Sequence, residues 1–497
     1  MVQENRQLRE ENRLLRQKID ALARQMFGTK SEKLSPGQME MLLCSLEETP
    51  EEPEASVEEP THSTEAPKKK SPSKPRRPRV PEHLPVEELV IDPDEVTSDP
   101  SQWRQIGEEV SEQIDYEPGR FICRRTIRRT WVKRKDPDAV PLTAPLPPKL
   151  LDRSILAPGL LAHVVVGKYV DHLPLYRQQQ IFKQRHAVEL GRNTLCRGVE
   201  LVADSLQLVA RQMMLDQVRT GYVQLDETPV DYLKPGNGKT AKGYFWTMNV
   251  PGGDTVYHWA PGRGYEHLRR WLPSDFDCLI QTDEYSCYNK LNKELELPAH
   301  ARCWAHARRK YMDALKQGEH PRRLRWILHQ IGLLYRIEKR LREQNAGPAL
   351  RNAVRASESR PIIDRLFKLW RQMSIDRKYK PQTLTGKALA YALKIESGLK
   401  VYVAHGQVEI DNNLAENSIR PLTLGRKNWL FIGTQEAGWR SAVIYTILQS
   451  CKNHDIDPYA YLKDVLERLP HMTNQQIGDI TPRAWADEQR RSMKLAS

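Results

Sequence analysis

The chain has few residues of the kinds that build disulfide frameworks, zinc sites or membrane spans. Its 497 residues include 7 cysteines, and no two of them form a Cys-X-X-Cys pair. This argues against zinc sites and disulfides and favours reduced thiols in a cytosol. The longest apolar stretch, 154–170, contains Pro158, His163 and Lys168 and is too short to cross a bilayer. No signal peptide follows Met1, so we expect a soluble intracellular protein.

The chain also has fewer acidic than basic residues. The chain has 77 Lys and Arg against 64 Asp and Glu, a formal net charge of +13. Binding of lysine and arginine to phosphates is favourable, because it neutralises charge and releases the counterions of the phosphates. The balance favours a polyanionic partner, although many soluble proteins are basic.

At this length several domains are expected, because one hydrophobic core rarely serves so long a chain. In the first segment, residues 1–45, leucine recurs every seven residues at Leu8, Leu15 and Leu22, and Asn5 and Asn12 lie at the other seam position. Asparagine at this seam favours two parallel strands. We predict a coiled coil that joins the chain into a homodimer or higher oligomer; an ordinary amphipathic helix is the alternative.

Two segments of different composition follow. Residues 46–81 hold seven Glu between positions 47 and 59 and seven Lys or Arg between 68 and 79, among Pro and Ser. Such a segment buries too little apolar surface to fold, so it is predicted to be a disordered linker. Its basic half either contacts a DNA backbone or is simply solvated. Residues 82–150 alternate apolar and polar positions, for instance at 113–116 and 121–124, which indicates a small β-rich module.

Residues 151–216 change to a helical pattern. One helix is expected at 173–185 and another from Thr194 onward, with a turn at 189–193 that contains Gly191. Asn193 is placed to cap the second helix. This pattern is that of a helix-turn-helix that enters a DNA major groove, and plain helical packing produces it as well.

Two acidic residues are predicted at the ends of strands within residues 217–300. Residues 221–226 form a short apolar strand that ends in Asp226, and residues 277–282 form another that leads into Asp283. Further strands are expected at 244–250 and 255–259, and a helix at 265–272. Carboxylates at strand ends in one sheet can converge on a hard cation, but aspartate is also common in turns and caps.

A third acidic residue lies far along the chain. Glu416 would lie one helical turn before Arg420, so a surface ion pair is the simplest interpretation. The basic and aromatic run at 426–429 favours instead a nucleic-acid backbone held near an acidic site.

Several motifs resemble one protein family. In chain order they are KYVDHLPLYRQ at 168–178, LDETP at 225–229, TDEY at 282–285, CWAHARR at 303–309, DNNLAE at 411–416 and GRKNWLF at 425–431. With the N-terminal leucine repeat and its tail at 27–32, they closely resemble transposases of the insertion-sequence 66 family over nearly the whole chain. Each motif alone is weak evidence, whereas this many in one order are specific.

The resemblance implies an Asp-Asp-Glu integrase with a ribonuclease-H-like sheet, in which Asp226, Asp283 and Glu416 are the catalytic, metal-binding acids. The expected fold is therefore a multidomain α/β chain, with its core in two parts at 217–300 and 406–440. The 133 positions from Asp283 to Glu416 are too many for a loop. An all-helical insertion is predicted at 301–405, because the apolar residues recur there with helical spacing, and a helical C-terminal region at 441–497.

The implied chemistry uses two magnesium ions held by these acids, and manganese may substitute. The acids Glu227, Glu284 and Asp411 are the obvious alternatives. Cys303 and His306 suit softer ions and are expected to pack or to contact DNA.

The small N-terminal module departs from the family pattern. Family members commonly carry two Cys pairs that bind zinc there, whereas this module has only Cys123. One thiol cannot make a four-ligand site, so no zinc is predicted and the module is expected to be degenerate.

The function implied is that of a DNA transposase that cuts the ends of its element and joins the freed 3′-hydroxyls to target DNA. Six cations are the candidate DNA contacts: Arg308, Arg309, Lys310, Arg420, Arg426 and Lys427. A solvated helix face is the alternative for those in the insertion. Expected partners are both DNAs and the family's usual accessory proteins, in the bacterial cytoplasm on the nucleoid, with no membrane. The competing functions are a non-catalytic DNA-binding or assembly protein and a ribonuclease-H-like nuclease without strand transfer.

Overall fold

The structure is a computed structural model of the chain. It describes residues 119–123, 130–131, 142–143, 148–151, 154–234, 239–376 and 378–496. All of these belong to one compact unit, Pro118–Ser497. The predicted coiled coil at 1–45, the charged linker at 46–81 and most of the β-rich module at 82–150 lie outside the described residues, so these predictions stay predictions.

The described part of the small module is a pair of short antiparallel strands, β1 (Thr130–Trp131) and β2 (Leu142–Thr143). Residues 121–123, where apolar and polar positions alternate, have neither helix nor strand. Phe121 packs edge-on against Phe182, with ring centroids 5.1 Å apart, and against His186 at 5.2 Å. Helix α5 (Leu175–His186) therefore covers this apolar side chain.

Three helices follow, as the helical periodicity predicts: α4 (Pro158–Tyr169), α5 (Leu175–His186) and α6 (Arg192–Val218). The expected N-cap is wrong. Gly191 is the N-cap of α6, with extended backbone, and its carbonyl accepts hydrogen bonds from the amides of Thr194 (2.9 Å) and Leu195 (3.2 Å). Asn193 consequently lies inside the first turn, where its side chain cannot cap the helix.

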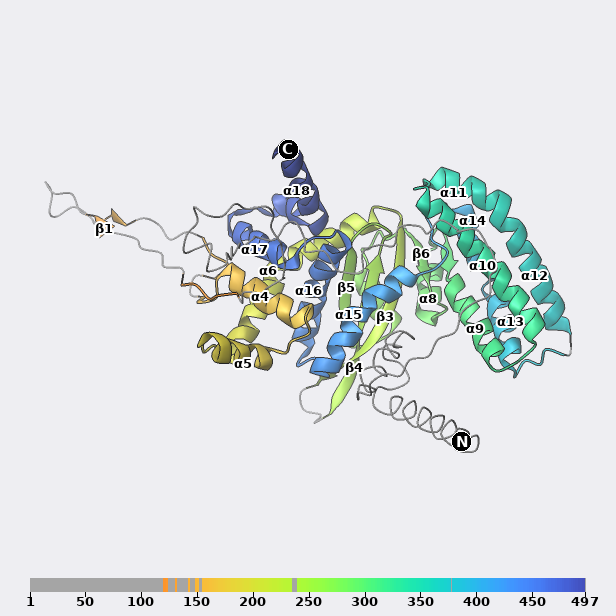
Figure 1. The fold of residues 1–497 in the computed structure, drawn as a ribbon, viewed down its shortest axis with the longest axis horizontal. Coiled ribbons are helices and arrows are strands. Elements are labelled where there is room, and N and C mark those ends of the chain that lie inside the picture. The colour runs from red at the N-terminus through yellow and green to blue at the C-terminus, as the bar shows by residue number, and fades with distance from the viewer. Residues whose placement is uncertain are drawn as a thin grey trace, which may run out of the picture. The chain divides into compact units, whose positions relative to one another are not determined.

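One five-stranded sheet forms the centre of the unit (Figure 1). Its strands are β3 (Tyr222–Leu233), β4 (Thr240–Asn249), β5 (Thr255–Ala260), β6 (Leu279–Thr282) and β7 (His300–Arg302). Their order is β5-β4-β3-β6-β7. The β5, β4 and β3 strands are antiparallel neighbours, whereas β3, β6 and β7 are parallel. Helices α7 (Tyr265–Trp271) and α8 (Ser286–Glu294) connect β5 to β6 and β6 to β7.

The strand that carries Asp226 is longer than expected. We predicted that it ends at Asp226, but β3 continues to Leu233. The reason is its long hairpin with β4, in which Asp226 pairs with Thr247 and Leu233 with Thr240. Only the parallel pairing of β3 with β6 ends earlier, at Gln224.

Helices cover both faces of this sheet. On one face Phe245 packs against Tyr445 of α16 (Gln435–Asn453), with ring centroids 6.2 Å apart. On the other face the next residue, Trp246, packs against Tyr288 of α8 at 6.0 Å. Helix α15 (Asn413–Trp429) lies with α16 on the first face (Figure 1). The sheet is therefore the middle layer of three.

The segment predicted as an all-helical insertion, 301–405, begins with the last two residues of β7 and is mainly helical after them. It contains α9 (Trp304–Lys316), α10 (Pro321–Glu343), α11 (Pro348–Val354), a π-helical turn (Arg355–Ser359), α12 (Arg360–Ile375), α13 (Leu384–Lys394) and α14 (Glu396–Ala404). These helices gather beside β6 and β7 (Figure 1). They enclose a second core in which Trp370 stacks on Tyr311, with ring centroids 5.4 Å apart. Trp326 of α10 is 40% exposed.

The C-terminal region is also helical, with α17 (Pro458–Arg468), two 3-10 turns (Leu469–His471 and Asn474–Ile480) and α18 (Pro482–Ala496). Helix α17 packs against α4. Buried residues of both helices belong to the same hydrophobic core as those of the sheet. Among the helices of the described ranges, none combines the length and the apolar character needed to cross a membrane.

A fully buried ion pair holds the insertion together, and we expect its disruption to be costly. Arg355 donates from Nε and Nη2 to the two carboxylate oxygens of Glu338, at 2.8 and 2.7 Å, and both side chains are 0% exposed. In the variant Arg355→Met, Glu338 stays buried without its cation, which should lower the free energy of unfolding by about 3–5 kcal/mol in urea titrations.

The exposed pair between Arg340 and Glu358, at 2.6 Å, provides the matched control. The substitution Arg340→Met should cost less than about 1 kcal/mol, because water screens exposed pairs. The double variant Arg355→Met with Glu338→Leu should recover much of the loss. Equal costs for Arg355→Met and Arg340→Met would contradict the importance of the buried pair.

Candidate functional site

Asp226 and Asp283 each follow a glutamine on adjacent parallel strands. Gln224 of β3 pairs in register with Gln281 of β6, and Gln224 Nε2 donates to Gln281 Oε1 at 2.9 Å. Each aspartate lies two positions after its glutamine. Side chains two positions apart along a strand point to the same face. The two carboxylates therefore share one face, at equivalent positions of neighbouring strands.

The same two glutamines attach the segment that leads into α15. Gln224 Nε2 donates to the carbonyl of Asp411 at 3.0 Å, and Gln281 Nε2 donates to that of Glu409 at 2.8 Å. The Tyr222 hydroxyl donates to Gln281 Oε1 at 2.5 Å and accepts from the Glu409 amide at 3.2 Å. This glutamine network, Tyr222, Gln224 and Gln281, is buried. It fixes the start of α15 over the face that bears the two aspartates.

Glu416 lies in the first turn of α15 and contacts the insertion. Its Oε1 is 3.6 Å from His306 Nε2, and its Oε2 is 3.3 Å from Arg309 Nη2, both on α9. Arg420, the partner that i+4 spacing suggests, is exposed and forms no ion pair in the described structure. The third acid is thus held between sheet and insertion rather than paired along its own helix.

The electrostatics of Asp226 show that the three acids influence one another. Burial, together with the negative charges of Glu227, Asp283 and Glu416, raises the pKa of Asp226 to about 8. One hydrogen bond, from the Glu227 amide to Asp226 Oδ1 at 2.8 Å, favours the charged carboxylate and so lowers this pKa. A carboxyl with a strongly raised pKa among other acids is a typical feature of functional sites.

The donors on this face fit a hard cation. Asp226 Oδ1 accepts one backbone amide, and Asp283 Oδ1 accepts that of Tyr285 at 2.9 Å. The second oxygen of each aspartate accepts no hydrogen bond from any described residue. Carboxylate oxygens are the ligands that Mg²⁺ takes. The three acids do not form a tight group, because His306 and Arg309 draw Glu416 toward α9.

A second donor set shares Glu416. Within the described ranges, Cys303, His306 and Glu416 form the one group of three potential ligands whose atoms all lie within 4.8 Å of one another. Sulfur and imidazole suit borderline ions such as Zn²⁺. However, burial raises the pKa of the Cys303 thiol to about 12, which keeps the sulfur protonated and opposes metal binding. His306 instead contacts the third acid, a role that the sequence did not suggest.

The neighbouring acids already have strong partners. Glu227 points to the opposite face of the sheet, where it accepts from Arg263 Nε at 2.8 Å and from the Tyr288 hydroxyl. Glu284 pairs with two cations, at 3.0 and 3.3 Å. Asp411 accepts from the backbone and side-chain amides two residues further on, at 3.2 and 3.0 Å. These three acids are therefore occupied in holding the fold.

The six candidate DNA-binding cations fall on two helices, α9 and α15. Three of them also have contacts within the protein: Arg309 with Glu416, Lys310 over the Tyr391 ring at 4.4 Å, and Arg426 with the carbonyl of Pro229 at 2.5 Å. The other three, Arg308, Arg420 and Lys427, are exposed, and no described carboxylate pairs with them. These three are the freest to meet a polyanion.

The glutamine network was missed in the sequence, although a signal was present. Both strands read Gln-X-Asp, at 224–226 and 281–283. A polar residue two positions before an acid, on a strand that is otherwise apolar, lies on the same face as that acid. Such a repeat points to two side chains that share one task.

The glutamine network should be essential to stability. The substitution Gln281→Met keeps the volume but leaves the carbonyl of Glu409 without its donor and the O–H of Tyr222 without its acceptor. Each unsatisfied group should cost about 1–3 kcal/mol in the free energy of unfolding. Guanidinium unfolding measures the loss, and faster amide hydrogen exchange at Glu409 should accompany it.

Gln330 is the matched control, because it is buried and makes no hydrogen bond to any described residue. Gln330→Met should be nearly neutral or stabilising. A loss for Gln281→Met no larger than that for Gln330→Met would show that the network contributes no stability.

The raised pKa of Asp226 should make the protein less stable as pH rises. The folded state keeps a proton that the unfolded chain releases near pH 4, so stability falls between about pH 4 and the folded pKa near 8. Asp226→Asn removes this effect. In EDTA the variant should therefore melt several degrees above the wild-type protein at about pH 8.5, and the two should converge at about pH 4.

Asp277→Asn is the control, because Asp277 is exposed and lies at the opposite end of the strand that leads into Asp283. It should follow the wild-type protein at both pH values. A constant difference in Tm between Asp226→Asn and the wild-type protein across this range would contradict the raised pKa.

Three stretches of the chain match known protein families. Residues 153–440, which contain all three acids, match the family described as Transposase IS66 family. Residues 14–89 match a family described as Transposase C of IS166 homeodomain, and residues 446–482 match the IS66 C-terminal element.

Relatives span most of the chain. It is 32% identical over 471 residues to the uncharacterized protein y4qI of Sinorhizobium fredii (strain NBRC 101917 / NGR234), covering 91% of this chain and 85% of that protein. The uncharacterized protein y4jD of the same organism is 32% identical over 427 residues, covering 82% of each. The matched residues 153–440 make up more than half of the chain and include Asp226, Asp283 and Glu416. The chain therefore belongs to the IS66 family of transposases.

Proposed function

We propose that the protein cleaves DNA at the ends of a mobile element and transfers the freed 3′-hydroxyls to target DNA, with Asp226, Asp283 and Glu416 as its catalytic acids. The observation that carries this proposal is the placement of Glu416, 133 positions after Asp283, over the sheet face that bears both aspartates. The strand order is β5-β4-β3-β6-β7, in which β5, β4 and β3 are antiparallel neighbours and β6 and β7 run parallel to β3. This order supports a ribonuclease-H-like core.

The three acids have distinct tasks in this mechanism. Two magnesium ions, or manganese in their place, supply activation of the attacking water or 3′-hydroxyl and stabilisation of the departing oxygen. Asp226 would contact both ions, since the other two acids both act on it electrostatically. Asp283 and Glu416 would each hold one. Asp226 must lose its proton to do so, and the Glu227 amide on Oδ1 favours that loss.

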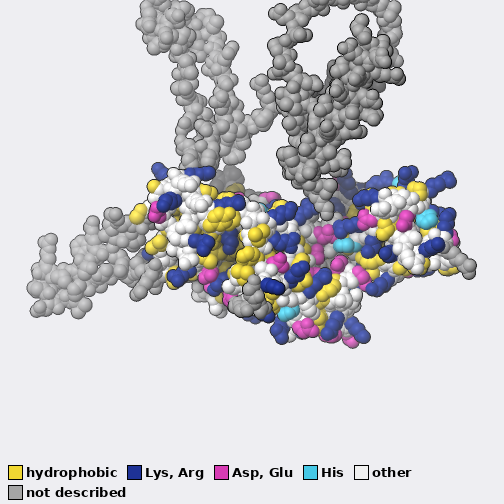
Figure 2. Space-filling model, turned by 90° about the horizontal axis from the view of Figure 1, so that it is seen from below, with side chains coloured by type: hydrophobic (Ala, Val, Ile, Leu, Met, Phe, Trp, Pro, Cys, Tyr) yellow, Lys and Arg dark blue, Asp and Glu magenta, His cyan; other side chains and the backbone are white. Residues whose placement is uncertain are grey.

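The surface suits a polyanionic substrate. Figure 2 shows Lys and Arg side chains over much of the visible face, with Asp and Glu gathered near its middle. Cations around an acidic centre offset the repulsion between carboxylates and phosphates. Arg308, Arg309 and Lys310 of α9 and Arg420, Arg426 and Lys427 of α15 are proposed to contact DNA. The homo-oligomer, the accessory proteins, the location on the bacterial nucleoid and the absence of structural zinc stay predictions.

A cleavage assay tests the catalytic assignment. Purified protein is incubated with labelled duplex DNA that carries the element's ends, with magnesium or manganese and a target plasmid. Asp226→Asn, Asp283→Asn and Glu416→Gln should each lower cleavage by more than about 100-fold, since even second-shell partners of metal ligands contribute 10–100-fold. Asp277→Asn should cleave like the wild-type protein.

The products separate the competing functions. Labelled strands joined to the plasmid support a transposase, whereas cleavage without joined products supports a nuclease. Equal cleavage by the wild-type protein and Asp226→Asn would refute the assignment of the three acids. DNA binding without any cleavage, together with a Tm that magnesium does not change, would favour a non-catalytic assembly protein.

A further inference from the structure

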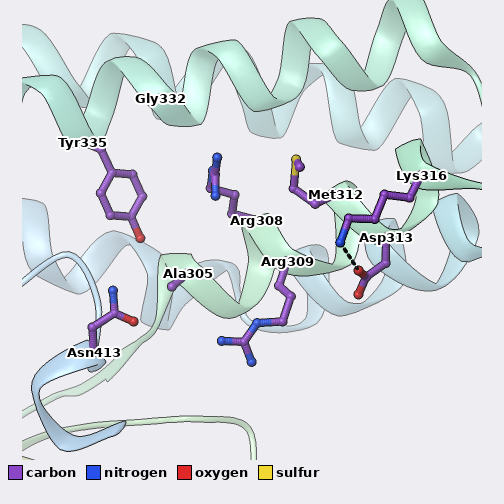
Figure 3. A pocket seen from close by; sticks show the side chains of 9 residues that line it. All are labelled: Ala305, Arg308, Arg309, Met312, Asp313, Lys316, Gly332, Tyr335 and Asn413. Carbon is purple, nitrogen blue, oxygen red and sulfur yellow. Dashed lines mark ion pairs between the residues drawn. The ribbon is translucent and has the colours of Figure 1, made fainter. Parts of the chain in front are cut away.

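We propose that a pocket between α9, α10 and the start of α15 binds an unpaired nucleotide of the DNA strand that enters the catalytic site. The pocket has a volume of about 500 Å³, and Figure 3 shows the side chains that line it. This inference rests on the proposed function, because it assigns one part of the DNA to one part of the protein.

The pocket adjoins the third acid. Arg309 lines it and lies 3.3 Å from Glu416. Asn413 also lines it, three positions before Glu416 in the same helix. A nucleotide in the pocket would therefore be close to a phosphodiester bond at the acids.

The charge of the pocket suits phosphate. Arg308, Arg309 and Lys316 line it from α9, and the one acid among its lining residues, Asp313, pairs with Lys316 at 3.9 Å. Arg308 is exposed and has no carboxylate partner in the described part of the chain. Arginine without a protein partner, beside an acidic site, is free to contact a phosphate.

One residue of the pocket wall is a glycine that the packing of the protein does not require. Gly332 lies inside the 23-residue helix α10. A Cβ added there would meet no atom within 4 Å, so no neighbour requires the missing side chain. Glycine inside a helix costs about 0.5–1 kcal/mol relative to alanine. The bare backbone keeps the pocket open, which indicates a ligand that lies against α10.

The size and lining of the pocket favour a single nucleotide over a duplex. Its volume falls within the range of small-molecule sites, about 300–1,000 Å³. A double helix does not enter such a space, since its major groove alone is about 12 Å wide. Met312 and the Tyr335 ring offer an apolar surface for a base, and Asn413 offers a polar group for its edge (Figure 3).

A binding experiment without metal tests this proposal separately from catalysis. Fluorescence anisotropy in EDTA compares two labelled probes, a short duplex and the same duplex with a short single-stranded 3′ extension. Arg308→Ala and Gly332→Leu should weaken binding of the extended probe at least about fivefold, the lower end of one stacked base. Gly332→Leu should bind the plain duplex like the wild-type protein, and Arg308→Ala should weaken binding of the extended probe more than binding of the plain duplex.

Two controls exclude indirect effects. Arg325→Ala removes an exposed arginine of α10 that does not line the pocket, and it should leave the preference for the extended probe unchanged. Gly332→Leu should melt no lower than the wild-type protein, because leucine favours the helix. For Arg308→Ala, the slope of log K against log salt with the extended probe should become less steep by about 0.7, the value for one phosphate of a single strand.

Three results would overturn the proposal: equal weakening on both probes, which would make the pocket part of a duplex surface; unchanged binding in both variants; or the same loss in Arg325→Ala. All three can occur in a protein that still cleaves DNA through Asp226. Conversely, loss of the extended-probe preference in a protein whose Asp226→Asn variant cleaves normally would leave the pocket assigned and refute the catalytic acids.

Discussion

The site depends on hydrogen bonds from two buried glutamines to a segment that lies more than a hundred residues further along the chain. Gln224 and Gln281 hold the carbonyls of Asp411 and Glu409, and with them the first turn of α15. These groups are buried, so each would be costly if its partner were removed. Two neighbouring strands thus define where the third acid lies, although that acid belongs to neither strand.

The helical insertion supports the same arrangement from the other side. Arg355, held by Glu338, also donates from Nη1 to the carbonyls of Tyr402 and His405, at 2.8 and 3.1 Å. It therefore fixes the end of α14, only a few residues before the segment that the glutamines hold. At the start of the insertion, His306 and Arg309 reach Glu416 from α9. The start of the insertion therefore contacts the third acid, and its end leads into the segment that the glutamines hold.

Much of this architecture follows from local patterns, and the rest depends on contacts that are distant in sequence. Apolar periodicity predicts four of the five sheet strands and the helices of the insertion, and it places Asp283 correctly after its strand, but it misses β7. It could not show that β3 continues past Asp226, because the partner strand β4 determines that length. It also gave Glu416 the wrong neighbour, since spacing along one helix suggests Arg420 whereas α9 supplies the actual partners. The repeated Gln-X-Asp pattern was the one local sequence feature that pointed to the glutamine network.

An acidic site that acts on a polyanion has to solve a problem of charge. Burial and the neighbouring acids raise the pKa of Asp226, and the three carboxylates also repel the phosphates they are proposed to handle. Salt screens exposed charges beyond about 10 Å at 0.1 M, so distant lysines cannot compensate. Arg309, 3.3 Å from Glu416, lies well within that distance, and Arg308 precedes it on the same helix. The helix that contacts the third acid thus also brings positive charge within this distance of the site.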